Sequence, residues 1–125
     1  MIEFKDFQIL SRTFRQYNDT LELNLKHKRL DGGTTMYAFI VNPNSRSGLG
    51  LKIWGKLELI LKERHIDYQI YFTRYPGHGA KLAAQICDTD ADTLVVLGGD
   101  GTIGEVVGGI RDLTKLTLAY IPIGS

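Results

Sequence analysis

The residues best suited to chemistry in this sequence are five in a row, Gly98-Gly99-Asp100-Gly101-Thr102. Glycine carries no Cβ, so the three glycines leave backbone N–H groups open to a ligand and permit positive φ angles. An apolar run, Thr93 to Leu97, precedes them and is typical of a buried strand. The residues that follow have helical spacing, so the glycines form a turn that leads into a helix N-terminus. Such a turn binds anions, and phosphate is the ligand that it predicts.

Asp100 needs a separate explanation, because a carboxylate repels bound phosphate. A metal ion between the two would remove this repulsion, and a carboxylate would also be needed there if a proton must be moved. The first hypothesis is therefore Mg²⁺ with a nucleotide at Asp100. Thr102 is predicted to cap the following helix. The apolar positions of that helix recur at the spacing of one face: Ile103, Val106, Val107 and Ile110.

Two other readings of the glycines stay open. Gly99-x-Gly101-x-x-Gly104 satisfies the dinucleotide fingerprint, but the acidic residue expected about 20 positions later is absent from Tyr120 to Gly124. The glycines could also form a turn without a ligand. The Walker pattern is excluded, since no Gly-Lys-Ser or Gly-Lys-Thr occurs in the sequence.

The motif resembles a known family. Gly98–Thr102 followed by Glu105-Val106-Val107-x-Gly109 is similar to the nucleotide-binding signature of the diacylglycerol kinase catalytic-domain family, which includes sphingosine kinases and bacterial lipid kinases. The NAD kinases share the five-residue core, so an NAD-kinase-like domain remains an alternative, but the Glu-Val-Val extension favours the lipid kinases. The resemblance implies transfer of the γ-phosphoryl group of ATP to a lipid hydroxyl. It makes ATP and Mg²⁺ the cofactors, Asp100 the catalytic and metal-binding residue, and Gly98 to Gly104 the phosphate-binding stretch.

A second polar loop follows the apolar run Tyr37–Val41, which is typical of a strand buried on both faces. The loop, Asn42 to Gly50, stands at the carboxyl end of a strand, where open α/β sheets bind ligands. It resembles the Asn-Pro-x-Ser loop that contacts the nucleotide in the lipid kinases. Arg46 and Ser47 lengthen it relative to the family's shorter form. The nucleotide-binding residues implied here are Asn42, Asn44, Ser45 and Arg46.

Three further positions come from the same resemblance. In the family, a threonine ending the second strand contacts the nucleotide and a Gly-His-Ala element opens the next helix, which points to Thr73 and His78. Gly77-His78-Gly79-Ala80 matches that element with one extra glycine. Pro122-Ile123-Gly124-Ser125 matches a later Pro-x-Gly-Ser element, and adds Ser125 to the nucleotide contacts.

The elements that must position these residues are those of an α/β fold with an open, mostly parallel sheet and flanking helices. Strands are predicted over 37–41, 68–73, 93–97 and 116–121, with helices over about 51–64, 80–87 and 102–110. Trp54 lies on the apolar stripe of the first helix and is predicted to be core rather than a base-stacking platform. Cys87 is predicted on a buried helix face; as the single cysteine it excludes an internal disulfide.

Length and composition set the remaining bounds. The chain has 125 residues, 43% of them hydrophobic, and a net charge of +1, which indicates one globular domain and gives no indication of nucleic acid binding. No apolar run approaches the ~18 residues that cross a bilayer and no secretory signal opens the chain, so a cytoplasmic location is expected. Residues 1–35 are expected to be an extension of uncertain order, without a motif.

The domain expected over 36–125 is the ATP-binding half of the enzyme, truncated before the C-terminal domain that holds the lipid pocket in the family. The lipid substrate would bind through that missing domain, and this chain alone is expected to be inactive. Peripheral membrane association and a homodimer are left open. Gly104 and Gly108 stand where related kinases commonly carry asparagine, which supports a further alternative, a non-catalytic nucleotide-binding remnant.

Overall fold

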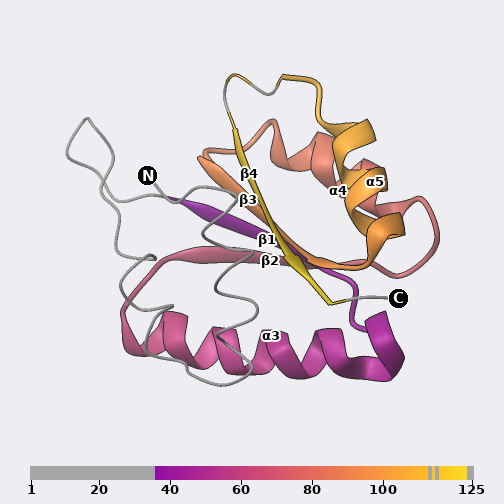
Figure 1. Ribbon diagram of the computed structural model, residues 1–125. Helices are drawn as coiled ribbons and strands as arrows, with labels where there is room; N and C mark the ends of the chain where they lie inside the picture. Colours follow the sequence, from indigo (N-terminus) through magenta and orange to yellow (C-terminus); the bar gives the residue numbers. More distant parts are fainter. Residues whose placement is uncertain (1–35, 113, 115, 124–125) are drawn as a thin grey trace.

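The computed structural model describes residues 36–112, 114 and 116–123, so the predictions for residues 1–35 and Ser125 lie outside the described part. Within it, four parallel strands form one sheet in the order β2-β1-β3-β4. The strands are β1 (Tyr37–Val41), β2 (Tyr68–Phe72), β3 (Thr93–Gly98) and β4 (Thr117–Pro122). Figure 1 shows helix α3 (Ser45–Glu63) on one face and α4 (His78–Ile86) with α5 (Asp100–Gly109) on the other. The predicted α/β class with flanking helices is confirmed.

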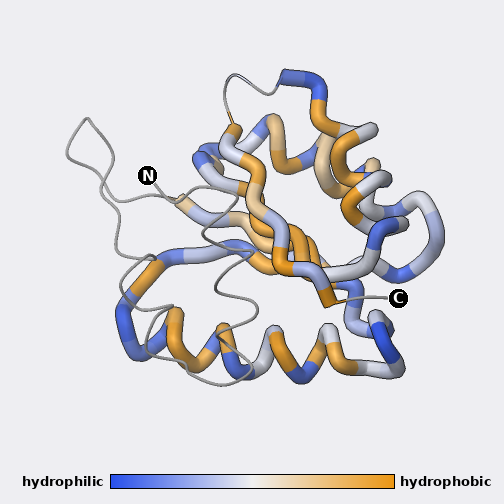
Figure 2. The backbone as a smooth tube through the Cα atoms, viewed as in Figure 1, coloured by the Kyte–Doolittle hydropathy of each residue, from blue (hydrophilic) through white to orange (hydrophobic). Residues whose placement is uncertain are grey.

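The two central strands are apolar because helices cover both of their faces. Every residue of β1 and β3 is buried, as expected for strands inside a parallel sheet. Alternate side chains of these strands belong to two hydrophobic cores, one on each face of the sheet. Phe39 and Leu97 pack toward α3, whereas Ile40 and Val96 pack toward α4 and α5. In Figure 2 the central strands are accordingly orange or pale along most of their length.

The core under α3 contains an aromatic cluster. Trp54 is 3% exposed, and its ring lies 5.1 Å from that of Phe39 and 5.6 Å, edge to face, from that of Tyr68. Its prediction as a core residue is confirmed. Aromatic pairs at such distances add to the free energy gained by apolar burial.

The connections create a topological switch point at the carboxyl ends of β1 and β3. These strands are neighbours, but the chain leaves β1 toward the α3 face and leaves β3 toward the opposite face (Figure 1). The loops therefore diverge and leave a crevice between them, which is where open α/β sheets bind ligands. The N–H of Asn42 donates to the carbonyl of Leu97 at 2.9 Å and ties the two strand ends together.

Several predicted boundaries differ from the structure. Helix α3 begins at Ser45 rather than near residue 51, although Arg46, Ser47 and Gly48 have positive φ angles of 47°, 56° and 95° and interrupt its first turn. Helix α4 begins at His78, two residues earlier than predicted. Val107, expected on the buried stripe of α5, is 46% exposed, because that helix buries Val106 and the two side chains diverge by about 100° around the axis. No helix among the described residues is both long and apolar enough to cross a membrane.

Candidate functional site

A cavity of about 510 Å³ opens at the carboxyl ends of β1, β2 and β3. Three segments far apart in the sequence line it: the loop after β1, the loop after β2, and the glycine turn with the start of α5. Their lining residues are Asn42, Asn44, Ser45, Arg46, Thr73, Arg74, Tyr75, Pro76, Gly99, Asp100, Gly101, Thr102 and Glu105. Most of the predicted site residues therefore lie around one cavity, which a parallel sheet makes possible by placing these strand ends at one edge.

Asn42 joins two of the three segments. Its side-chain amide donates to Thr102 Oγ1 at 3.3 Å, and its Oδ1 accepts the N–H of Asn44 at 3.1 Å. Thr102 is 8% exposed. The prediction that Thr102 caps α5 is wrong: the N-cap is Gly99, without a side-chain cap bond, and Thr102 is the third helical residue. Its hydroxyl instead accepts a hydrogen bond from the loop after β1.

Gly98 does not line the cavity, and its role is to leave space for Thr102. A Cβ at Gly98 would lie 2.7 Å from Thr102 Cβ and 2.8 Å from its Oγ1, closer than real Cβ atoms approach. The carbonyl of Gly98 also accepts the Tyr120 hydroxyl at 3.2 Å and the N–H of Ile123 at 2.9 Å. The backbone of Gly98 thus connects the glycine turn to the end of β4.

Asp100 is exposed at the first helical position of α5, where the helix dipole favours a negative charge. Burial raises the pKa of Tyr120, and the negative charge of Asp100 adds to that rise. Among the described residues no three or more His, Cys, Asp or Glu side chains are grouped so that they could hold a metal ion. A Mg²⁺ ion at Asp100 would fit only as one held by a single carboxylate together with phosphate oxygens and water, which is a common arrangement for this ion.

Glu105 is the carboxylate that sequence reasoning did not assign to the site. Its Oε2 accepts the N–H of Gly77 at 3.0 Å and its Oε1 accepts the N–H of Gly79 at 3.1 Å. These partners lie 28 and 26 positions earlier, at the start of α4. The only signal in the sequence was its place in the Glu-Val-Val extension, because spacing rules do not reach across two helices.

Two arginines also line the cavity, the predicted Arg46 and the unpredicted Arg74. Both are exposed, and over the described ranges neither side chain forms an ion pair. Arg46 has φ 47° and Ser47 has φ 56°, a left-handed conformation that costs non-glycine residues energy. The cavity mouth therefore combines cations with the N-terminus of α5, and both attract anions.

His78 supports the loop after β2 and does not line the cavity. Its Nδ1 accepts the N–H of Arg74 at 3.0 Å, and its ring stacks on Tyr75 with centroids 4.4 Å apart. Gly104 is exposed and is not among the lining residues; a Cβ there would meet no atom within 4 Å. The structure thus leaves His78, Gly98 and Gly104 outside the cavity lining.

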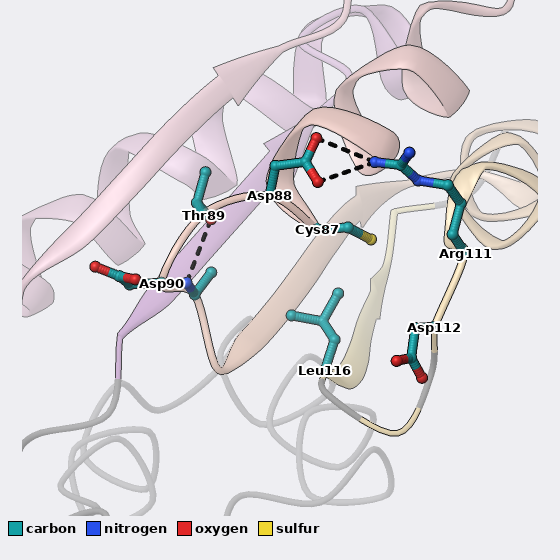
Figure 3. Close-up of a pocket in the computed structure, with 8 residues that line it drawn as sticks. Cys87, Asp88, Thr89, Asp90, Arg111, Asp112 and Leu116 are labelled. Atoms are coloured by element: carbon teal, nitrogen blue, oxygen red, sulfur yellow. Dashed lines mark hydrogen bonds and ion pairs between the residues drawn. The ribbon is translucent and has the colours of Figure 1, made fainter.

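A second cavity, of about 670 Å³, lies near the amino ends of β3 and β4 and contains none of the predicted site residues. Figure 3 shows the Arg111 guanidinium facing both oxygens of Asp88, each 3.1 Å from Nη2. The same nitrogen donates to the carbonyl of Ala84 at 3.1 Å. Cys87, predicted on a buried helix face, is half-buried at the C-cap of α4 and borders this cavity, because the helix ends at Ile86.

Comparison with known proteins gives consistent matches. The family model described as "Diacylglycerol kinase catalytic domain" matches residues 36–125. The chain is 36% identical over 90 residues to "Putative lipid kinase YtlR" of Bacillus subtilis, covering 70% of this chain and 29% of that protein. It is 30% identical over 87 residues to "Diacylglycerol kinase" of Staphylococcus saprophyticus, covering 69% and 28%. The match to "Sphingoid long chain base kinase 5" of Saccharomyces cerevisiae is 27% over 94 residues, with 69% and 14% covered.

A solved structure gives the same result for the fold. The crystal structure titled "a putative diacylglycerol kinase from Bacillus anthracis str. Sterne" superposes with a TM-score of 0.59 at 27% identity, covering 70% of this chain and 30% of that one. The chain thus spans about three tenths or less of the length of the relatives that it matches.

Proposed function

Because the chain belongs to the diacylglycerol kinase catalytic-domain family, we propose that it forms the ATP-binding part of a lipid kinase. The reaction would transfer the γ-phosphoryl group of ATP to a lipid hydroxyl, such as that of diacylglycerol. The lipid site, and any association with a membrane, would belong to the part of such a kinase that lies beyond the region matched here.

The observation that carries the proposal is the cavity at the switch point. Its glycine turn leads into α5, whose N-cap Gly99 contributes no side-chain bond, and the first N–H groups of an α-helix have no acceptor within the helix. These N–H groups, together with the exposed Arg46 and Arg74, favour a polyphosphate. The loops after β1 and β2 supply amide and hydroxyl groups for the rest of a nucleotide.

The proposed roles follow from the position of each segment. Asn42, Ser45 and Thr73 would contact the adenosine, and the triphosphate would lie along Gly99–Thr102, the part of the glycine turn that lines the cavity. Asp100 would bind Mg²⁺ directly or through a water molecule, or accept the proton of the attacking hydroxyl. When bound, Mg²⁺ would neutralise charge on the phosphates. Catalysis of this kind depends mostly on positioning and charge neutralisation.

Calorimetric titration with ATP, with and without Mg²⁺, tests the proposal. We expect the wild-type chain to bind ATP in a Mg²⁺-dependent manner. Asp100→Ala should weaken that binding at least tenfold, which corresponds to about 1.4 kcal/mol. The reason is that, among the described residues, Asp100 is the only cavity-lining carboxylate that does not accept backbone N–H groups.

Asp90→Ala is the matched control, because Asp90 is an exposed carboxylate at the second cavity. It should bind ATP as the wild type does. Unchanged affinity in a folded Asp100→Ala variant would remove Asp100 from its role. A wild-type chain that is folded by circular dichroism but does not bind ATP would reduce the proposal to a likeness of fold.

A further inference from the structure

We infer that Glu105 is a positioning residue of the candidate site, which holds the loop between β2 and α4 in the shape that nucleotide binding requires. The ligand in this inference rests on the proposed function, whereas the contact itself is a feature of the structure. Glu105 lines the cavity and reaches the start of α4 at the same time. It therefore connects the helix that carries the glycine turn to the loop on the other side of the cavity.

Both carboxylate oxygens of Glu105 are in use. One accepts the N–H of Gly77 at 3.0 Å and the other accepts the N–H of Gly79 at 3.1 Å. Gly77 is the N-cap of α4, has φ 89°, and supplies no side-chain cap of its own. Glu105 thus caps α4 from a different helix and places a negative charge at its positive end. Charge-assisted bonds of this kind are stronger than neutral ones.

Close packing leaves Glu105 little freedom to move. Gly79 is buried, and a Cβ there would lie 3.0 Å from Glu105 Oε1 and 3.3 Å from Glu105 Cβ. One turn further along α5, a Cβ at Gly109 would lie 2.1 Å from the carbonyl oxygen of Ala80. The extra glycine at position 79 and the glycine at 109 therefore let the two helices approach until the carboxylate meets the N–H groups.

The loop that this contact fixes lines the cavity through Thr73, Arg74, Tyr75 and Pro76. Its first residue, Thr73, is anchored by its N–H to the carbonyl of Val41 at 2.9 Å. Its far end is anchored at Gly77 by Glu105. Loss of the Glu105 contact would release the loop at its Gly77 end. Nucleotide binding would then have to order the loop, which costs binding free energy.

The same geometry separates Glu105 from Asp100. Because the two oxygens of Glu105 already accept backbone donors, binding a metal ion there would compete with the cap of α4. Asp100 is the cavity-lining carboxylate left for that purpose among the residues that are described. Loss of the Glu105 contact should therefore weaken nucleotide binding equally with and without Mg²⁺, whereas loss of Asp100 should act through Mg²⁺ alone.

The test uses Glu105→Gln, which keeps the size of the side chain but has only one acceptor oxygen. Its NH₂ group would face the second backbone N–H and could not accept a hydrogen bond from it. Two readouts are needed. Amide hydrogen exchange in the nucleotide-free chain should speed up about tenfold at Gly77 and Gly79. Titration with ATP and with ADP should show binding about tenfold weaker in both the presence and the absence of Mg²⁺. Glu105→Asp, one methylene shorter, should fall between Glu105→Gln and the wild type.

Glu63→Gln, an exposed carboxylate at the end of α3, is the matched control and should change neither readout. Faster exchange with unchanged affinity in a folded variant would overturn the inference and leave Glu105 as a helix cap only. A loss of affinity confined to Mg²⁺-containing buffer would also overturn it. If the wild-type chain itself binds no nucleotide, the proposed function fails and the inference fails with it, and the exchange data then show only whether the contact exists.

Discussion

At the scale of single residues, Gly98 shows how a position without ligand contact can decide the shape of the site. Its α-hydrogen faces the Thr102 side chain, where a Cβ would lie within 2.7 Å of Thr102 Cβ. We expect Gly98→Ala to displace Thr102, break its hydrogen bond with Asn42, and lower the free energy of unfolding by about 1–3 kcal/mol. Urea denaturation of the two chains measures the difference.

Gly104→Ala is the informative control for that prediction, because Gly104 lies on α5, as Thr102 does, and an added Cβ there would meet no atom within 4 Å. Alanine there should raise the free energy of unfolding by about 0.5–1 kcal/mol, since glycine is a poor helix former. Equal stability of Gly98→Ala and the wild type would show that the turn can move away from Thr102 without cost.

At the scale of elements, the end of α3 forms a left-handed cap. The N–H of His65 donates to the carbonyl of Lys62 at 3.2 Å, and the N–H of Ile66 to that of Leu61 at 2.9 Å, the two bonds of a Schellman motif. His65 has φ 55°, a conformation that glycine adopts without the penalty paid by other residues. We expect His65→Gly to raise the free energy of unfolding by about 1 kcal/mol, measured by urea denaturation.

The control at this position is His65→Ala, which keeps a Cβ and should give no gain. A decrease in stability for His65→Gly would mean that the imidazole contributes more than the backbone conformation costs.

Between elements, α4 and α5 are held together at both ends. Glu105 accepts N–H groups at the start of α4, and Arg111 donates to Ala84 and pairs with Asp88 at its end. The signs of these charges match the dipole of α4, negative at the N-terminus and positive at the C-terminus. The two helices therefore pack together as one unit on their face of the sheet.

At the scale of the whole molecule, tyrosines with raised pKa values make the stability depend on pH in the alkaline range. Burial, a hydrogen bond to Glu58 at 2.6 Å and the charge of Glu58 raise the pKa of Tyr68 to about 12. In the unfolded chain tyrosine ionises near pH 10. Between about pH 10 and 12 the unfolded state therefore binds fewer protons than the folded state, and the free energy of unfolding falls as pH rises. The contribution is complete below about pH 10 and is lost as pH passes about 12.

Burial raises the pKa values of Tyr37 and Tyr120 as well, so the effect adds across the molecule. We expect urea midpoints to decrease from pH 10 to 11.5, with a smaller decrease in Tyr68→Phe, which has no hydroxyl to ionise. Glu58→Gln keeps an acceptor for the hydroxyl but removes the charge, and should lie between the two. Identical slopes for the wild type and Tyr68→Phe would exclude Tyr68 as a source of the dependence.

Local pattern was enough to predict the strands and the order of elements. The apolar runs at 37–41 and 93–97 could only be satisfied by burial on both faces, and both proved to be central strands. Local pattern failed for two residues of α5. Val107 was placed on a buried stripe by spacing alone, and Thr102 was assigned as a cap because it follows a glycine turn. Tertiary packing decided both, since α5 buries only the side that faces β3 and α4.

The sequence by itself determined the parallel α/β architecture, the three polar loops at strand ends and the likeness to the lipid kinases, because each depends on residue types that are close together in the chain. The tertiary structure alone decided which of those residues share a cavity and which support it. Glu105 meets Gly77 and Gly79 across 26 to 28 positions, and Gly98 leaves room for Thr102. Such contacts arise only when helices pack against each other and against the sheet, and no periodicity in the sequence encodes the distance between two helices.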